Sequence, residues 1–131
     1  MPITALFALP LALLYFALSF RVIGRRRAER VEIGDGNDRE LLRRVRVHAN
    51  AAEYIPLGLI TMGLAEGLAA PPWLLVAAGT VLLAGRLSHA YGLSQSPHNM
   101  RLRVAGMAMT FTAISISALT AFGLAAWTFL S

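Results

Sequence analysis

Long apolar runs alternate with short charged or polar segments along the 131-residue chain. Residues 2–23, 73–92 and 104–130 are mostly apolar. About 20 apolar residues in a helix are enough to cross the ~30 Å hydrocarbon core of a bilayer. Residues 39–68 begin amphipathic and become apolar after position 49, so we expect a further span there. The pattern predicts an all-α, integral membrane four-helix bundle that forms a single domain over residues 1–131.

The segments between these runs carry turn and capping signals. Residues 25–38 read RRRAERVEIGDGND, in which GDGN predicts a turn and Asp38 can cap the next helix. The two prolines at 71 and 72 predict a short turn, and the SQSPHN sequence at 94–99 predicts a polar loop. Only the first connection is expected to form a substantial loop.

The composition excludes several classes of protein and site. A hydrophobic content of 56% and a mean hydropathy of +0.60 are too apolar for an ordinary soluble protein. The chain has no cysteine, and its three histidines lack the paired spacing of metal ligands, so we expect no metal site. The net charge of +5 comes from arginines beside the apolar runs, without interleaved aromatic residues, and this placement argues against a nucleic-acid partner.

The distribution of arginine predicts an orientation. The first and third connections are rich in arginine, whereas the second turn and both termini carry none. Cytoplasmic loops of membrane proteins carry an excess of cations, so we expect a multi-pass protein of the cell (inner) membrane with both termini outside the cytoplasm. Five polar residues from separate segments would then lie near the cytoplasmic end: Arg46, Asn50, Arg86, His89 and Arg101.

A polar stripe interrupts the second predicted span. Arg46, Asn50 and Glu53 are spaced i, i+4 and i+7, which places them on one face of a helix. An ionisable group in hydrocarbon costs roughly 2.5 to 3.5 kcal/mol on insertion scales, so we expect this face to border an interhelical cleft rather than lipid. The stripe is the candidate site. The alternative is an Arg46–Glu53 ion pair that only holds two helices together.

The sequence RVRVHANAAEYIP at residues 44–56 resembles the second-helix signature of the MAPEG family, the membrane-associated proteins of eicosanoid and glutathione metabolism. The resemblance extends to the number of spans, the GDG loop and GRLSHAYG at residues 85–92, and it is greatest to small bacterial members of unassigned role. Members of the family are trimers of four-helix protomers, and the enzymes among them bind glutathione between neighbouring protomers. The resemblance therefore implies a homotrimer in membrane lipid with glutathione as a bound co-substrate.

The resemblance also implies roles for individual residues. Arg26 and Arg27 match helix-one arginines that contact glutathione or lie near its thiol, and both are candidate catalytic residues. The implied glutathione contacts are Arg46, Asn50, Glu53 and Tyr54 on the second helix, His89 on the third and Arg101 at the start of the fourth.

Three features depart from the family pattern. Ala49 stands where some relatives carry a second arginine, and Leu93 stands where an aromatic residue is expected one turn after His89. The loop before Arg101 also differs in length from that of the better-known enzymes. The first two departures favour a non-enzymatic scaffold that binds lipid or a partner in the same cleft.

The chemistry of the ligand fits the residues of the stripe. Glutathione carries two carboxylates, one ammonium and a thiol; arginine binds carboxylates through its planar fork, and Glu53 can bind the ammonium. A guanidinium beside the thiol favours the reactive thiolate, a role that we assign to Arg26 or Arg27. The sequence therefore favours a glutathione-dependent transferase or peroxidase acting on lipophilic electrophiles. A four-span transporter in which Glu53 exchanges protons is a third hypothesis, although the surrounding arginines would repel a cationic substrate.

Overall fold

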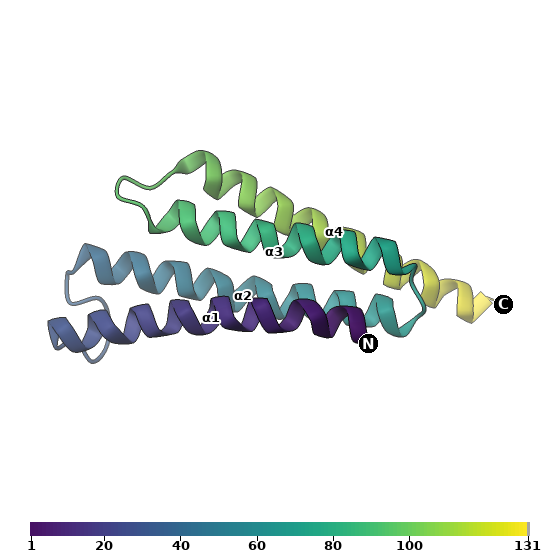
Figure 1. Ribbon diagram of the computed structural model, residues 1–131, viewed down its shortest axis with the longest axis horizontal. Coiled ribbons are helices and arrows are strands. Elements are labelled where there is room, and N and C mark those ends of the chain that lie inside the picture. Colours follow the sequence, from purple (N-terminus) through teal and green to yellow (C-terminus); the bar gives the residue numbers. More distant parts are fainter. Residues whose placement is uncertain (131) are drawn as a thin grey trace.

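The computed structural model describes residues 1–130 and contains four helices (Figure 1). These are α1 (Pro2–Glu29), α2 (Arg39–Gly67), α3 (Pro72–Ser94) and α4 (Met100–Leu130). No strand occurs among the described residues. The predicted all-α four-helix architecture is confirmed.

The helices α1 and α4 differ by more than two residues from the apolar ranges predicted from the sequence, whereas α2 and α3 agree within two residues. The apolar run of α1 ends at residue 23, but the helix continues to Glu29, where Arg25 and Glu29 form an i, i+4 ion pair at 3.0 Å and Arg30 follows in the left-handed conformation that ends the helix. The first connection is therefore shorter than expected, at residues 30–38. α4 begins before residue 104 because Asn99 caps it, with Oδ1 accepting a hydrogen bond from the Leu102 amide at 3.1 Å.

The helices form two layers, α1 with α2 and α3 with α4 (Figure 1). The connections rich in arginine, α1 to α2 and α3 to α4, lie at one end of the bundle, and the α2–α3 turn and both chain ends lie towards the other. Among the described residues the backbones of α1 and α4 do not approach each other closely, so α2 and α3 occupy the centre. Both connections therefore lie on the same side of the membrane if the helices cross it, as the orientation predicted from arginine requires.

Three helices, α1, α3 and α4, are long and apolar enough to cross a membrane. α2 is long enough but not apolar enough by the same measure of hydropathy, and polar residues such as Asn50, Glu53 and Glu66 interrupt its apolar part. It nevertheless lies lengthwise beside α1 and α3 in the bundle. The crossing of the bilayer by α2 and the position of both termini outside the cytoplasm stay predictions.

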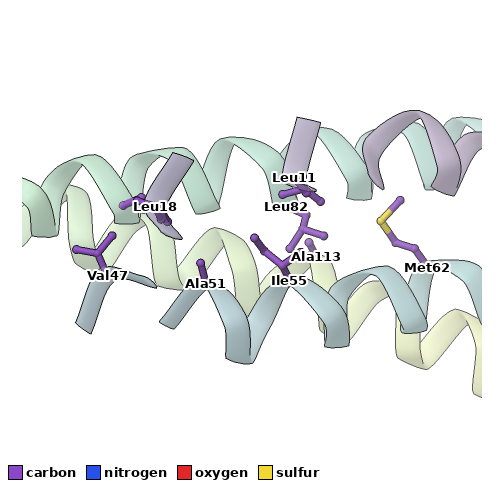
Figure 2. Close-up of a cluster of buried hydrophobic side chains, with 9 residues drawn as sticks. Leu11, Leu18, Val47, Ala51, Ile55, Met62, Leu82 and Ala113 are labelled. Atoms are coloured by element: carbon purple, nitrogen blue, oxygen red, sulfur yellow. The ribbon is translucent and has the colours of Figure 1, made fainter. Parts of the chain in front are cut away.

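The core is built on one face of α2. From Val47 to Met62 its buried residues recur every three or four positions, at 47, 51, 55, 58 and 62, which is the helical period. Figure 2 shows side chains from all four helices meeting on this face. The central cluster consists of Leu11, Leu18, Val47, Ala51, Ile55, Met62, Leu82, Ala90 and Ala113.

The α3–α4 contact depends on glycine. A Cβ placed on Gly106 would lie 2.5 Å from the backbone nitrogen of His89 and 2.6 Å from the carbonyl oxygen of Gly85. A Cβ on Gly85 would lie 2.9 Å from the carbonyl oxygen of Gly106. Small residues let the backbones of membrane helices approach closely, and here they bring α3 and α4 into direct backbone contact.

A carboxylate of α2 caps the beginning of α1. Glu66 accepts hydrogen bonds from the backbone amides of Ile3 and Thr4, both at 2.8 Å, and from the Thr4 hydroxyl at 2.7 Å. The first amides of a helix have no partner within the helix, and a negative charge there is favoured by the helix dipole. Glu66 therefore fastens the start of α1 to the end of α2.

Asp38 connects the other ends of α1 and α2. Its Oδ1 accepts a hydrogen bond from the Glu40 amide at 2.9 Å, which confirms the predicted cap of α2. Its Oδ2 pairs with Nε of Arg25 at 2.7 Å. The hydrogen bond from Arg25 holds the pKa of the Asp38 carboxyl below its ordinary value, although burial acts in the opposite direction.

Acid should remove the stability that this ion pair contributes. Because the pKa of Asp38 is lower in the folded protein than in the unfolded chain, the contribution is complete above the unfolded value of about 3.9 and is lost as the pH falls through the folded value. Asp38→Asn keeps a capping side chain but has no carboxyl to titrate. We expect wild type to have the higher Tm at pH 7 and the difference to vanish on acidification, in detergent melts at several pH values. A difference that stays constant with pH would contradict the role of the ion pair.

Candidate functional site

A polar cleft of about 210 Å³ opens between α2, α3 and α4, and its lining residues lie towards the ends of these helices that carry the arginine-rich connections. It brings together four of the residues predicted from the sequence. The lining residues are Arg46, Ala49, Asn50 and Glu53 of α2, His89 and Leu93 of α3, and Arg103 of α4. Three further cavities along the bundle are lined mainly by apolar side chains, and a fourth, at the end of α1, is lined mainly by charged ones.

The position of the polar stripe follows from the helical period. Arg46 and Asn50 each precede by one residue a member of the buried stripe, Val47 and Ala51. Each residue turns the helix by 100°, so the polar stripe lies beside the core face rather than opposite it. It therefore borders the neighbouring helices, as expected for polar groups in an apolar protein.

The alternative of an Arg46–Glu53 ion pair is not found. Within residues 1–130 neither Arg46 nor Glu53 forms a salt bridge or a side-chain hydrogen bond, and both are exposed in the single chain. A guanidinium and a carboxylate are thus both available in one cleft. Such a cleft can bind a ligand that carries charges of both signs.

Arg86 lies buried beside the cleft, at 2% exposure. Its Nη1 donates to Oδ1 of Asn50 at 2.7 Å and its Nε donates to Oγ1 of Thr110 at 2.9 Å. Its Cζ lies 5.3 Å from the centre of the Tyr54 ring, a cation–π distance. Arg86 therefore links α2, α3 and α4 through one side chain.

Tyr54 is half-buried, packs against Arg86 and does not line the cleft. Its ring packs edge-on against Phe111 with the centroids 5.5 Å apart, and its face receives Arg86. The predicted contact of Tyr54 with a ligand stays a prediction.

His89 and Arg103 form the α3–α4 wall of the cleft. Nδ1 of His89 lies 3.1 Å from the backbone oxygen of Arg103. A carbonyl oxygen only accepts, so Nδ1 carries the hydrogen and Nε2 of the neutral ring remains free to accept. The buried Nε of Arg103 has no hydrogen-bond partner among the described residues. Both side chains also border an apolar groove of about 340 Å³ that includes Met107 and Phe111.

The sequence pointed to Arg101 at the start of α4, but the structure places Arg103 in the cleft and leaves Arg101 exposed outside it. Residues two positions apart lie on different faces of a helix. A signal for Arg103 was available in the small residues Gly106, Thr110 and Ala113, which are spaced to face α3. Arg103 extends that series backwards by three residues.

Arg26 and Arg27 lie in a different place from the cleft. They line a groove of about 360 Å³ at the end of α1, together with Ile23, Arg30 and the loop that follows. Nη1 of Arg26 donates to the carbonyl oxygens of Gly34 at 2.8 Å and Glu32 at 3.4 Å, so its guanidinium holds the loop. Arg27 is exposed and makes no such bond within residues 1–130. A single chain thus does not bring the two candidate catalytic arginines to the stripe.

Within residues 1–130 there is no group of three or more His, Cys, Asp or Glu side chains that could hold a metal ion. The charged groups of the cleft are instead two guanidiniums and one carboxylate. This set suits an organic ligand with carboxylate and ammonium groups.

Comparison with known proteins identifies the family. The model of the MAPEG family matches residues 4–129. The chain is 41% identical over 118 residues to the inner membrane protein YecN of Escherichia coli strain K12, and equally to YecN of the O6:H1 strain CFT073. Each match covers 89% of this chain and 88% of the relative. The chain therefore belongs to the MAPEG family and is a membrane protein of that family.

Proposed function

We propose that this protein is a glutathione-dependent transferase or peroxidase of the bacterial inner membrane that acts on lipophilic electrophiles. The observation that carries the proposal is the cleft in which Arg46, Glu53 and Arg103 come together without pairing among the described residues. Two guanidiniums suit the two carboxylates of glutathione, and one carboxylate suits its ammonium. The location is supported by the relative YecN, whose name describes an inner membrane protein.

The size of the cleft supports a site shared between protomers. Ligand pockets commonly measure about 300–1,000 Å³, and the cleft of one chain is smaller, at about 210 Å³. Arg46 and Glu53 are exposed in the single chain, so a neighbouring protomer can supply the missing wall. We therefore propose a homotrimer, as the family resemblance implies, with membrane lipid around it.

The reactive step is assigned to a helix-one arginine. A guanidinium near the thiol stabilises the thiolate, which attacks the electrophile. Arg26 is engaged by two backbone oxygens, whereas Arg27 has no partner among the described residues, so Arg27 is the better candidate for this role. In the proposed trimer α1 of one protomer would bring it to the cleft of the next. The apolar groove that shares His89 and Arg103 with the cleft offers a place for the lipophilic substrate.

Replacing Arg46 by alanine tests the proposal. We expect the variant to bind reduced glutathione about tenfold more weakly than wild type, which corresponds to about 1.4 kcal/mol for a lost charge-assisted contact. Isothermal titration in detergent measures the affinity. Arg39→Ala is the matched control, because it removes the same charge from an exposed position of the same helix outside the cleft.

Two results would contradict the proposal. One is the absence of glutathione binding to wild type at millimolar ligand. The other is an equal loss of affinity in Arg39→Ala and Arg46→Ala, which would indicate a general charge effect rather than a contact in the cleft.

A second function, a non-enzymatic scaffold that binds lipid or a partner, is favoured by two observations. Ala49 and Leu93 make part of the cleft wall apolar, and Arg26 is occupied in holding the loop. Such a protein would bind glutathione or a similar ligand but show no thiolate absorbance and no conjugation of a generic aryl halide. Conjugation by the purified protein would exclude it.

A further inference from the structure

Arg86 is a buried cation that has no carboxylate partner within residues 1–130. It is the largest fully buried side chain of the chain, and none of the salt bridges within residues 1–130 includes it. Burying a charge is costly unless hydrogen bonds replace its water. The backbone oxygen of Asn50 at 3.4 Å and Sδ of Met107 at 3.2 Å complete its partners.

The hydrogen bonds around Arg86 have fixed directions. Thr110 donates its hydroxyl hydrogen to the backbone oxygen of Gly106 at 2.8 Å, which leaves an oxygen lone pair for Nε of Arg86. Guanidinium nitrogens only donate, so the Asn50 atom 2.7 Å from Nη1 of Arg86 must be the amide oxygen. The orientation of the Asn50 amide thus follows from the chemistry of Arg86.

This orientation decides what Asn50 presents to the cleft. The oxygen of its amide is held by Arg86, and Asn50 also lines the cleft, so the Nδ2 donor is the group that remains for a ligand. Nδ2 has no hydrogen-bond partner among the described residues. A donor there suits a carboxylate or peptide carbonyl oxygen rather than an ammonium.

We propose that Arg86 is a positioning residue that fixes the Asn50 amide with Nδ2 towards the cleft, as a donor to an oxygen of the ligand. The inference rests on the glutathione site proposed above. Asn50 then adds a neutral donor to the two arginines of the cleft, and Glu53 remains the group for the ammonium. Arg86 itself is not expected to touch the ligand, because it is buried and does not line the cleft, and each of its three nitrogens donates to Asn50, Thr110 or Met107.

Asn50→Asp tests separately the oxygen that Arg86 holds and the Nδ2 donor that faces the cleft. Aspartate keeps an oxygen for Arg86 and adds an ion pair, so the Tm should not fall below that of wild type. It lacks the Nδ2 donor, so we expect reduced glutathione to bind at least about tenfold more weakly in isothermal titration. Wild-type affinity in this variant would overturn the proposal, and so would a lower Tm, since aspartate would then not replace the asparagine oxygen at Arg86.

Arg86→Gln tests whether Arg86 acts through Asn50. We expect affinity for glutathione to fall about tenfold in the wild-type background and less than about twofold in an Asn50→Ala background, because residues that act as a unit are not additive. Full additivity of the two changes would overturn the proposal.

A second measurement does not depend on glutathione. The chain has three asparagines, so the side-chain amides in an NMR spectrum of asparagine-labelled protein are few, and Asn50→Asp identifies the pair of signals from Asn50. Arg86→Gln should shift that pair and leave those of Asn37 and Asn99 in place. Unchanged Asn50 signals would overturn the role of Arg86. If wild type binds no glutathione, the proposed function fails, and the NMR result alone decides whether Arg86 holds the Asn50 amide.

Discussion

Replacing Gly106 by alanine is expected to destabilise the protein by about 3 kcal/mol, the upper part of the usual ~1–3 kcal/mol range for overpacked cores. The added Cβ would lie 2.5 Å from the His89 nitrogen and 2.6 Å from the Gly85 oxygen. These are backbone atoms, which cannot move aside as the end of a side chain can. Denaturation in mixed micelles, followed by the fluorescence of Trp73 and Trp127, measures the change in the free energy of unfolding.

The control is alanine at Gly123 of the same helix, which has no neighbouring atom within 4 Å of the position of a Cβ. Alanine forms helix better than glycine by about 1 kcal/mol, so Gly123→Ala should be neutral or slightly stabilising. If both variants unfold as wild type does, α3 and α4 do not approach each other as closely as the structure shows.

Replacing Glu66 by alanine is expected to lower the free energy of unfolding by about 2 kcal/mol, because three donors at the start of α1 lose their acceptor. Glu66→Gln should fall between wild type and alanine, since it keeps the oxygen that accepts from Ile3. The same unfolding experiment measures both variants.

Glu29→Ala provides the comparison for Glu66→Ala. Glu29 forms an i, i+4 pair with Arg25 while 41% of its side chain is exposed, and such a pair contributes little. Its loss should change the free energy of unfolding by no more than about 0.5 kcal/mol. Equal changes in the free energy of unfolding for the two alanine variants would mean that the Glu66 cap stabilises the protein no more than an exposed ion pair does.

Much of the fold could be predicted from the sequence because apolar runs of sufficient length and arginine-rich connections are strong signals. The helices α1 and α4 extend beyond the spans predicted from hydropathy, because hydropathy indicates burial in lipid whereas a helix ends where its backbone hydrogen bonds end. α1 continues through the charged segment that contains Arg25 and Glu29, and Asn99 caps α4 before its apolar part. Glu66 caps residues that lie far from it in the sequence: Ile3 is 63 positions away and Thr4 is 62 positions away. No local sequence pattern shows such a contact.

The candidate site could be predicted in part. The spacing of Arg46, Asn50 and Glu53 identified one wall of the cleft, because these residues share a helix and its period is known. The opposite wall depends on which faces of α3 and α4 meet, and that is set by the close packing of Gly85 and Gly106. This packing places Arg103 rather than Arg101 in the cleft. It also buries Arg86 beside the cleft, and the burial of a charged residue cannot be read from the sequence.

The two carboxylates that tie α1 to α2, Asp38 at one end and Glu66 at the other, both lie at or before residue 66, the middle of the chain. During synthesis these two helices can therefore join as a hairpin before the later half leaves the ribosome. The hairpin would enter the bilayer with its polar stripe uncovered, and the arrival of α3 and α4 would then close the wall around Arg46 and Glu53. In that order of events, the polar cleft between α2, α3 and α4 would form last.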